Sequence, residues 1–470
     1  MGKSNNFVSI ISMATQKDGP AGITRISVKG FKSLAREVSI TVAPLTILAG
    51  ANSSGKSSVL QPLLLLKQTL EANFDPGALL LNGPNVNFTS ITQLLSRIGS
   101  EQSDTLEVGI SCWNSGIKSV FKRAPKEGFE VVSTQYDVSG HEAFIVQPEM
   151  AVRDLYDFFR KHRRSNEALS EILLEAILRS AFGEALELRA ETVRCFLQPQ
   201  LTIKTKKEGH AGPAANVVFP IFDTAFSADF VRSLKAIIHL PGLRGNPERT
   251  YPVAGVGSNF PGSFQAYTAS VITQWQRAGD TKTLDLVGKE LESMGLSWHV
   301  RAHPIEDTQV EIKVSRLPHR SGSAEDDVSI ADVGLGLSQI LPLIVALHAA
   351  VRGQLVYLEQ PEIHLHPRAQ SRFGKVLVDA VRRGVRVVLE THSSLILLSI
   401  QTAVAEKEID PSDVCLHWFR RDAEGVTNVH SAALDENGAF GEWPEDFADT
   451  NLEAESRYLD AAEQIKPKVH

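Results

Sequence analysis

Cysteine is scarce in this chain, with only Cys112, Cys195 and Cys415 among 470 residues. The three are far apart and odd in number, so they form neither a disulfide framework nor a CxxC metal site. This pattern is typical of proteins kept in a reducing compartment. We therefore expect a cytoplasmic location.

Long apolar runs are also missing. The best candidate, Ile340 to Val351, contains His348 and has about half the length that a membrane-spanning helix needs. We therefore expect no membrane contact. The formal net charge of −7 also argues against a generally basic, nucleic-acid-coating protein, so any such contact must come from a local patch.

The most basic local run lies in RKHRRS and consists of Arg160, Lys161, Arg163 and Arg164. Such a run is most often a solvated helix face, and binding of nucleic acid or a partner protein is the alternative. No G-x-S-x-G motif occurs, and the acidic tail after His392 contains no D-x-D motif. These absences argue against a serine hydrolase and against a two-metal nuclease.

The chain divides by composition. Period-two alternation begins at Ile23 in ITRISVKGF and predicts strands. We expect a flexible leader at residues 1–22 and an N-terminal lobe at 23–147. The composition then becomes charge-rich, and we predict a helical insertion over 148–235. A strongly patterned C-terminal lobe follows at 236–470.

The segment GANSSGKS fits the phosphate-loop pattern G-x-x-x-x-G-K-[ST], between a buried strand and a helix. Glycines let the backbone wrap around a phosphate, whose charge is bound by successive amides and the helix N-terminus. In this motif the lysine reaches the β and γ phosphates, and the last hydroxyl is a Mg²⁺ ligand. We expect ATP or GTP binding with Mg²⁺. The expected contact residues are Gly50, Asn52, Ser54, Gly55, Lys56, Ser57 and Ser58.

Three segments of the last third carry further polar groups. ADVGLGLSQILPLI places a Gly-x-Gly turn and Ser338 before an apolar helix, as a second anion-binding helix start, and an ordinary N-capped helix is the alternative. LVYLE ends a buried strand at Glu359. VVLETHSS ends another buried strand at Thr391 and His392.

The order of these motifs is that of ATP-binding-cassette heads. KGFKS, GANSSGKSS, VGLGLSQ, LEQPEIHLHP and ETHSS resemble the bacterial SMC-like ATPases of the OLD-like branch. HLPGLRGNPERTY and DENGAFGEWPEDF resemble its stand-alone members, which lack a Toprim domain and often accompany anti-phage defence genes. The resemblance implies an α/β fold: a P-loop NTPase with an ABC/SMC-like head, a mixed sheet core and a helical insertion.

The resemblance also implies roles for residues that match the motifs. Lys56 and Ser57 hold phosphate and Mg²⁺, and Glu359 orients Mg²⁺ through water. His392 contacts the γ-phosphate. The resemblance places Phe31 and Lys32 near the base and ribose. It implies that Gly334, Gly336 and Ser338 contact the ATP of a partner subunit. It also implies a glutamine in the loop that joins the two lobes, for which Gln93 is the candidate. A surface position is the alternative for Gln93.

One position departs from the pattern. Gln360 stands where the residue that activates water is a glutamate, and an amide cannot accept a proton. Glu359 is occupied with Mg²⁺, so we predict slow ATP hydrolysis with Glu362 as the base. Purely electrostatic positioning of the water is the alternative. His364 and His366 are interpreted as structural because two histidines without a third ligand are a weak metal signal.

The leading functional hypothesis is a switch that dimerises around ATP, as a homodimer or a higher homo-oligomer, and controls an effector, a nuclease or a toxin, in anti-phage defence. The alternative is a non-hydrolysing, ATP-bound scaffold that sequesters such an effector or a nucleic-acid sensor.

Overall fold

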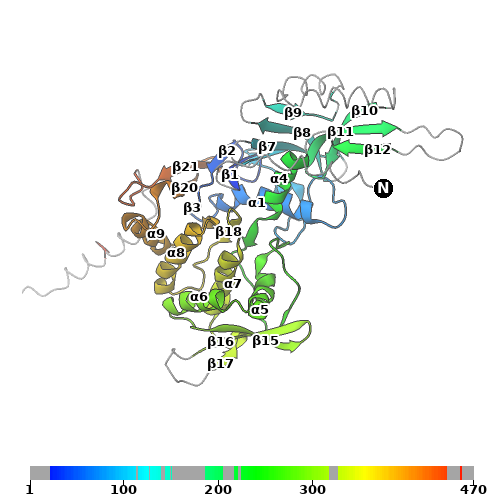
Figure 1. Cartoon of the computed structure of the whole chain (residues 1–470). Helices are drawn as coiled ribbons and strands as arrows, with labels where there is room; N and C mark the ends of the chain where they lie inside the picture. Colours follow the sequence, from blue (N-terminus) through cyan, green and yellow to red (C-terminus); the bar gives the residue numbers. More distant parts are fainter. Residues whose placement is uncertain are drawn as a thin grey trace, which may run out of the picture.

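The computed structural model describes residues 22–112, 115–125, 128–138, 143–148, 150, 186–204, 216–220, 224–316, 326–441 and 456–457. Its strands form two large sheets and several smaller ones. Figure 1 shows antiparallel strands at opposite ends of the molecule, with the parallel sheet and its helices between them.

The first large sheet is antiparallel and is built from the N-terminal part of the chain. Its strands, in spatial order, are β2 (Val38–Thr41), β1 (Ile23–Lys29), β6 (Thr105–Cys112), β7 (Ser115–Arg123), β8 (Phe129–Val138) and β9 (Phe144–Val146). A short pair, β4 (Arg97–Ile98) and β5 (Glu101–Gln102), and the 3₁₀ helix η1 (Ile91–Gln93) precede β6. The strands expected from Ile23 to about residue 145 are present.

The second large sheet has the spatial order β13 (Ile238–Leu240), β18 (Leu355–Glu359), β19 (Arg386–Glu390), β3 (Leu45–Gly50), β20 (Val414–Arg421) and β21 (Thr427–Ala433). Its first five strands run parallel, and β21 is antiparallel to β20. β3 comes from the N-terminal part of the chain but lies between β19 and β20. The parallel sheet therefore combines strands from both of the lobes that the sequence predicts.

β3 connects the two hydrophobic cores because its side chains alternate between the faces of the sheet. Leu45, Ile47 and Ala49 belong to the core with the C-terminal helices, whereas Leu48 belongs to the core with the N-terminal sheet. All six residues of β3 are buried, as expected for a strand covered on both faces.

Helices cover both faces of the parallel sheet. α1 (Lys56–Glu71) and α4 (Thr224–Lys235) pack together on the N-terminal side. The others are α5 (Thr268–Ala278), α6 (Thr281–Ser293), α7 (Leu335–Ala349), α8 (Pro367–Arg382) and α9 (Ser394–Ala405), with η3 (Phe264–Tyr267), η4 (Ile330–Asp332) and η5 (Pro411–Asp413) as 3₁₀ turns. An outer antiparallel sheet contains β14 (Tyr251–Pro252), β16 (Gln309–Ser315), β15 (Val300–Glu306) and β17 (Asp327–Ser329).

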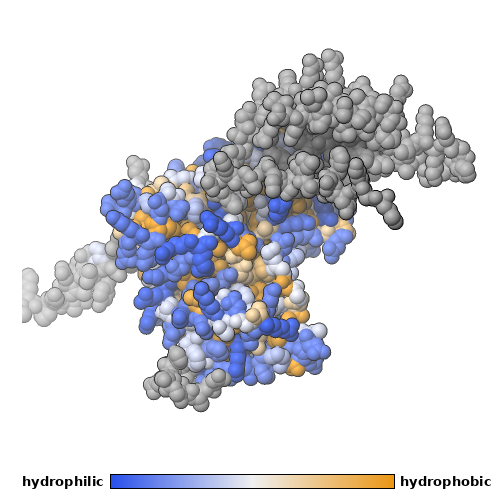
Figure 2. All heavy atoms as spheres, in the orientation of Figure 1, coloured by the Kyte–Doolittle hydropathy of each residue, from blue (hydrophilic) through white to orange (hydrophobic). Residues whose placement is uncertain are grey.

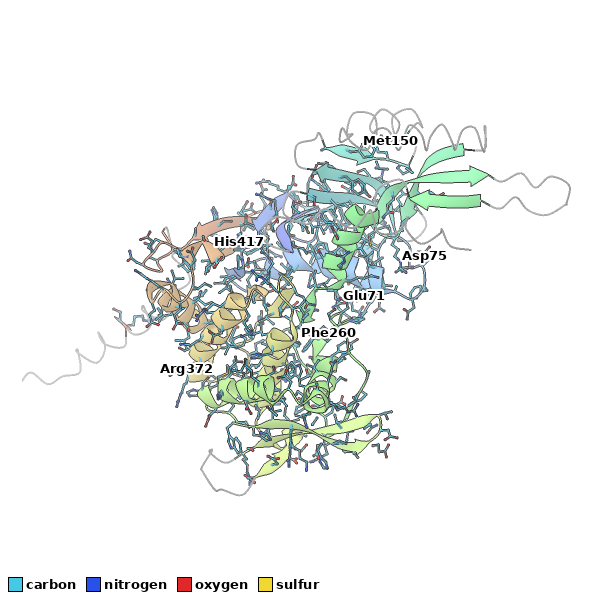
Figure 3. All side chains as sticks on the ribbon, viewed as in Figure 1. Glu71, Asp75, Met150, Phe260, Arg372 and His417 are labelled. Carbon is cyan, nitrogen blue, oxygen red and sulfur yellow. The ribbon has the colours of Figure 1, made fainter. Side chains whose placement is uncertain are left out.

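A buried lysine fixes α1 to the chain segments beside it. The Lys67 ammonium group pairs with Glu71 and donates to the carbonyls of Lys235 and Phe260, at 3.1 Å each. Figure 3 shows Glu71 and Phe260 near the junction of the two cores. Figure 2 shows that hydrophilic residues cover most of the visible face of the described chain.

The expected helical insertion is wrong for part of its length. Three antiparallel strands occupy it: β10 (Leu186–Val193), β11 (Phe196–Lys204) and β12 (Asn216–Pro220). The sequence LELRAETV has a period of two, but its charge-rich composition suggested a helix. Residues 151–185, with Arg160, Lys161, Arg163 and Arg164, lie outside the described residues, as do residues 1–21 of the leader predicted at 1–22.

No helix within the described ranges is both long and apolar enough to cross a membrane.

Candidate nucleotide-binding site

The segment from Gly50 to Ser57 runs from the last residue of β3 through a loop into the first turn of α1, as the motif predicts. Its backbone conformation requires small residues, with φ at 141° for Gly50 and 105° for Gly55. Ser53 also has a positive φ of 60°. A Cβ at Gly50 would lie 2.3 Å from the carbonyl oxygen of Phe419, and one at Gly55 would lie 2.5 Å from Thr427 Oγ1. The loop is thus held closely against β20 and the start of β21.

Lys56 curls back over this loop. Its ammonium group donates to the carbonyls of Gly50 and Ala51, at 2.9 Å each, and the residue is only 3% exposed. Burial lowers the pKa of Lys56, and the nearby Glu390 and Glu362 carboxylates oppose that effect. Ser54 Oγ is buried without a hydrogen-bond partner among the described residues. Asn52 is exposed and Ser58 is buried in the first turn of α1.

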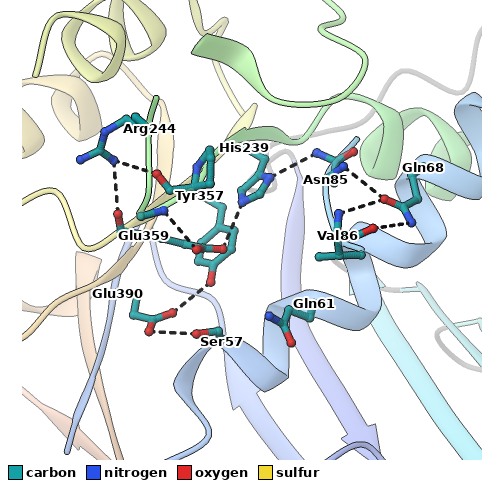
Figure 4. Close-up of polar contacts among 12 residues, drawn as sticks. Ser57, Gln61, Gln68, Asn85, Val86, His239, Arg244, Tyr357, Glu359 and Glu390 are labelled. Atoms are coloured by element: carbon teal, nitrogen blue, oxygen red, sulfur yellow. Dashed lines mark hydrogen bonds and ion pairs between the residues drawn. The ribbon is translucent and has the colours of Figure 1, made fainter. Parts of the chain in front are cut away.

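The carboxylate that contacts Ser57 is Glu390, which the sequence analysis did not single out. Ser57 Oγ donates to Glu390 Oε1 at 3.0 Å, and Tyr357 Oη donates to Glu390 Oε2 at 3.1 Å (Figure 4). Burial raises the pKa of Glu390, and the bond from Ser57 partly offsets this. The paired oxygens of Ser57 and Glu390 are suited to hold Mg²⁺, which prefers hydroxyl, carboxylate and water ligands.

Glu359 has a different environment from the one expected. Its carboxylate accepts bonds from His239 Nε2 at 3.1 Å and from the Gly242 amide at 3.2 Å. Burial opposes ionisation, but the hydrogen bonds from His239 and Gly242 outweigh it, and the pKa of Glu359 is lowered. The direct partner of Ser57 is therefore Glu390, and the water-mediated contact of Glu359 with Mg²⁺ remains a prediction.

His239 links Glu359 to the N-terminal part of the chain. It is 1% exposed, and its Nδ1 lies 3.2 Å from the Asn85 amide nitrogen. Because Nε2 faces a carboxylate and Nδ1 faces an NH₂ group, the contacts favour the tautomer protonated on Nε2. The ring also stacks on Tyr357. Asn85 thus contacts His239, and Tyr357, which stacks on His239, links this pair to Glu390.

The loop after β18 carries Gln360 and Glu362. Gln360 has a φ of 42°, and its backbone N–H donates to the backbone carbonyl of Glu390 at 2.8 Å. Glu362 accepts from Thr391 Oγ1 at 2.9 Å and from the His392 amide at 2.6 Å. Burial raises the pKa of Glu362 despite these bonds and the charge of Lys56. Glu362 is therefore anchored to the residues that follow β19, and its charge acts on Lys56 of the phosphate loop.

His392 lies at the same edge of the sheet. Burial lowers its pKa, and the charge of Lys56 lowers it further. Its Nε2 is buried without a hydrogen-bond partner among the described residues. A neutral imidazole beside a phosphate loop can accept or donate one hydrogen bond, depending on its tautomer.

Lys32 contacts Gln61 of α1 and the ring of Phe88. Its ammonium group donates to Gln61 Oε1 at 2.6 Å and lies 4.8 Å from the centre of the Phe88 ring. Burial lowers the pKa of Lys32, and the charge of Glu359 opposes this. Phe31 is fully buried and packs edge-on against Phe88. Base and ribose contacts for Phe31 and Lys32 remain predictions.

Gln93 is not the residue that reaches the acid-ended strand. Its side chain is exposed in η1 and accepts a bond from Thr89 at 3.3 Å. Glu359, at the end of that strand, is contacted instead by His239 of β13 and by Gly242, which follows β13. A glutamine was expected at this contact, and no motif in the sequence pointed to His239.

The second helix start expected to bind an anion is that of α7, whose N-cap is Gly334. Ser338 Oγ donates back to the carbonyl of Leu335 at 3.0 Å. A Cβ at Gly336 would lie 3.2 Å from the carbonyl oxygen of His364, so α7 packs against the loop after β18. Whether Gly336 and Ser338 reach the nucleotide of a second subunit remains a prediction.

A buried arginine completes the site. Arg244, in the loop after β13, is 7% exposed and donates from Nη1 to the carbonyls of Pro241 at 2.9 Å and Glu359 at 3.4 Å. Burial lowers its pKa to about 10, although the charges of Glu362 and Glu359 oppose this. The sequence analysis noted this arginine only as part of a loop.

Comparison with known families supports an ATPase. Residues 22–207 match the family described as "AAA ATPase domain", and residues 212–399 match the family described as "AAA domain, putative AbiEii toxin, Type IV TA system". A search of curated proteins found no match. The two family matches support an ATPase of the AAA type. Membership of the OLD-like branch and a link to defence remain predictions.

Among solved structures, similar chains are SMC heads. One is the SMC head bound to the C-winged helix domain of ScpA, with 14% identity, 88% of this chain and 98% of that chain covered, and a TM-score of 0.44. Another is the SMC head domain from Thermotoga maritima, with 11% identity, 87% and 98% covered, and a TM-score of 0.38. The ABC/SMC-like P-loop fold itself follows from the phosphate loop on β3 and the order β18-β19-β3.

Proposed function

We propose that the protein is a switch that binds ATP, hydrolyses it slowly and closes as a homodimer around it to control a partner effector. One observation carries this proposal: Lys56, Glu390, Glu362 and His392 meet at one edge of the parallel sheet, around a loop shaped for phosphate. ATP is the nucleotide that the AAA-type family matches support.

Nucleotide binding is supported by groups that lack partners. The Ser54 hydroxyl and His392 Nε2 are buried without hydrogen bonds among the described residues, which is unfavourable unless a ligand supplies them. Ser57 and Glu390 are the residues that would hold Mg²⁺. When bound, Mg²⁺ supplies positive charge that stabilises the phosphate oxygens during hydrolysis.

Slow turnover is supported by the carboxylates. The amide of Gln360 cannot accept a proton, so Glu362 remains the proposed base, and burial raises its pKa, which makes its carboxylate a stronger base. Both of its oxygens already accept hydrogen bonds, from Thr391 and His392, which restricts their approach to water. Glu390 is the second carboxylate in reach of the loop, held by Ser57 and Tyr357.

Dimerisation is supported by apolar exposure at the start of α7. Leu335 is 44% exposed, and Leu243, in the neighbouring loop, is 85% exposed. Exposed apolar residues on adjacent segments are typical of contact surfaces. We propose that Gly336 and Ser338 of one subunit face the ATP of the other, and that this shared contact favours the closed dimer.

Control of an effector in anti-phage defence is the remaining part of the proposal. The description of the second matched family names a toxin of a toxin–antitoxin system, which is a property of that family. A nuclease or toxin partner is consistent with it. Nucleic-acid binding through Arg160, Lys161, Arg163 and Arg164 stays an alternative contact, and a salt-dependent affinity would identify it.

The shared site can be tested by mixing two inactive variants. Lys56→Ala removes the phosphate contact, and Ser338→Arg blocks the contact across the dimer. Each subunit still offers the half that the other lacks, so the mixture should regain ATP hydrolysis at about one site per heterodimer. A mixture as inactive as either variant, with heterodimers shown to form, would contradict the shared site.

The base can be tested by single-turnover hydrolysis with Glu362→Gln, Glu359→Gln and Gln360→Glu. Loss of hydrolysis with retained ATP binding in Glu362→Gln supports Glu362 as the base. If that variant is neutral and Gln360→Glu accelerates hydrolysis at least about tenfold, the site holds ATP without an efficient base. If the wild type binds ATP and turns none over, the non-hydrolysing scaffold is the correct function.

A further inference from the structure

Arg244 carries a positive charge that the described residues leave only partly satisfied. One guanidinium nitrogen, Nη1, donates to the carbonyls of Pro241 and Glu359. The other two, Nε and Nη2, are buried and have no hydrogen-bond partner among the described residues. A buried charge with free donors is costly, and a negatively charged ligand would remove that cost.

The two free nitrogens lie on one edge of the guanidinium group. Nε–H and one N–H of Nη2 point in parallel, and this pair matches two oxygens of a phosphate or carboxylate. A point contact from water would satisfy one of them, whereas a tetrahedral phosphate satisfies both. The geometry therefore favours an oxyanion as the missing partner.

The position of Arg244 indicates that its oxyanion partner is a phosphate bound at this site. The loop after β13 lies at the same sheet edge as the ends of β18 and β19, and the backbone N–H of Gly242 donates to Glu359 Oε2 at 3.2 Å. Glu362 acts electrostatically on both cations, since its charge opposes the burial of Arg244 and that of Lys56. Both cations thus lie within electrostatic range of one carboxylate, with Lys56 at the end of the phosphate loop, and Figure 4 shows Arg244 beside Glu359.

The loop of Arg244 is also attached to the start of α7. Gln339 Nε2 donates to the carbonyls of Arg244 and Gly245, at 3.1 Å each. Arg249, further along the same loop, forms an exposed ion pair with Asp332 at 2.7 Å, just before α7. A movement of Arg244 towards a ligand would therefore be transmitted to α7 through Gln339.

We propose that Arg244 contacts the terminal phosphate of the nucleotide bound by the phosphate loop of the same chain, and so distinguishes triphosphate from diphosphate. This inference rests on the proposed ATP binding. It assigns the nucleotide-sensing role to an arginine in the loop after β13, and it gives α7 a direct signal of which nucleotide is present.

The test compares the affinities of a non-hydrolysable ATP analogue and of ADP, each with Mg²⁺, by titration calorimetry. Arg244→Met removes the charge, and Arg244→Lys keeps the charge but loses the paired donors. For Arg244→Met we expect the analogue to bind at least about tenfold more weakly and ADP to change less than about threefold, because only the triphosphate reaches the arginine. Arg244→Lys should be intermediate for the analogue.

Arg249→Met is the matched control, since its guanidinium group is exposed and paired outside the site, and it should bind both nucleotides like the wild type. Thermal melting without nucleotide provides a second measurement. The melting temperature of Arg244→Met should be equal to or higher than that of the wild type, because a poorly satisfied buried charge is removed.

Equal losses for the analogue and ADP, or no loss for either, would overturn the inference, and so would a lower melting temperature without nucleotide. A wild type that binds neither nucleotide would instead refute the proposed function.

Discussion

Replacing Gly55 by alanine tests whether the phosphate loop is shaped as described. Gly55 has a φ of 105°, which an L-residue adopts at a cost of about 1–3 kcal/mol. The added Cβ would lie 2.5 Å from Thr427 Oγ1 and 2.9 Å from Ser33 Oγ. Both distances are too short for stable contacts, so the loop or its neighbours must move.

The surrounding hydrogen bonds make that movement costly. Thr427 Oγ1 lies 2.8 Å from Ser33 Oγ and donates to the Ser54 carbonyl at 2.7 Å. Thr427 is β-branched and starts a strand, so it cannot simply turn away. Loss of two buried hydrogen bonds costs about 1 kcal/mol each, which brings the total destabilisation of Gly55→Ala to about 3–5 kcal/mol.

Gly77 is the matched control. Its φ is 77°, but a Cβ there would meet nothing within 4 Å, so Gly77→Ala should cost only the backbone strain of about 1–2 kcal/mol. The assay is urea-induced unfolding of both variants, followed by calorimetric titration with ATP. Gly55→Ala should also lose ATP affinity, because the displaced loop no longer surrounds the phosphate.

Two results would refute this reasoning. One is equal destabilisation by the two substitutions, which would mean that the overlap at Gly55 costs nothing. The other is ATP binding to Gly55→Ala with wild-type affinity. A double substitution with Thr427→Ala provides a further check, since removing the hydroxyl should recover part of the loss beyond additivity.

Three further predictions concern the groups around the loop. Glu390→Gln should keep the fold and reduce ATP hydrolysis by about tenfold or more, measured at saturating ATP, because the bond to Ser57 loses its charge assistance. Gln339→Leu should lower the free energy of unfolding by about 1–3 kcal/mol in urea, because it leaves two loop carbonyls without their donor. Burial raises the pKa of Glu362 above its ordinary value of 4.5, so the stability from this group is fully present below pH 4.5 and is lost as pH rises through the raised pKa. The stability of the wild type relative to Glu362→Gln, measured in urea without nucleotide, should therefore fall over that range, and a constant difference would contradict the raised pKa.

The sequence determined the features that depend on neighbouring residues. The spacing of glycines, lysine and serine in GANSSGKS defines a phosphate loop, and the apolar runs before Gly50 and Glu359 define buried strands, because both patterns are local. The order of the motifs indicated the fold, and the order β18-β19-β3 in the sheet agrees with it.

The insertion shows where local patterns misled. Residues 186–204 form strands, although their many charged residues suggested a helix. A period of two was present in the sequence but was outweighed by composition. Alternation measures which side chains share a face, whereas composition measures only how polar the segment is.

The tertiary structure alone decided which polar groups meet. Ser57 and Glu390 are 333 residues apart, and His239 and Glu359 are 120 apart. Hydrophobic periodicity shows that a strand is buried, but it does not show which strand lies beside it. Because β19 pairs directly with β3, Glu390 and not Glu359 reaches Ser57, and because β13 pairs with β18, the loop carrying Arg244 lies against Glu359.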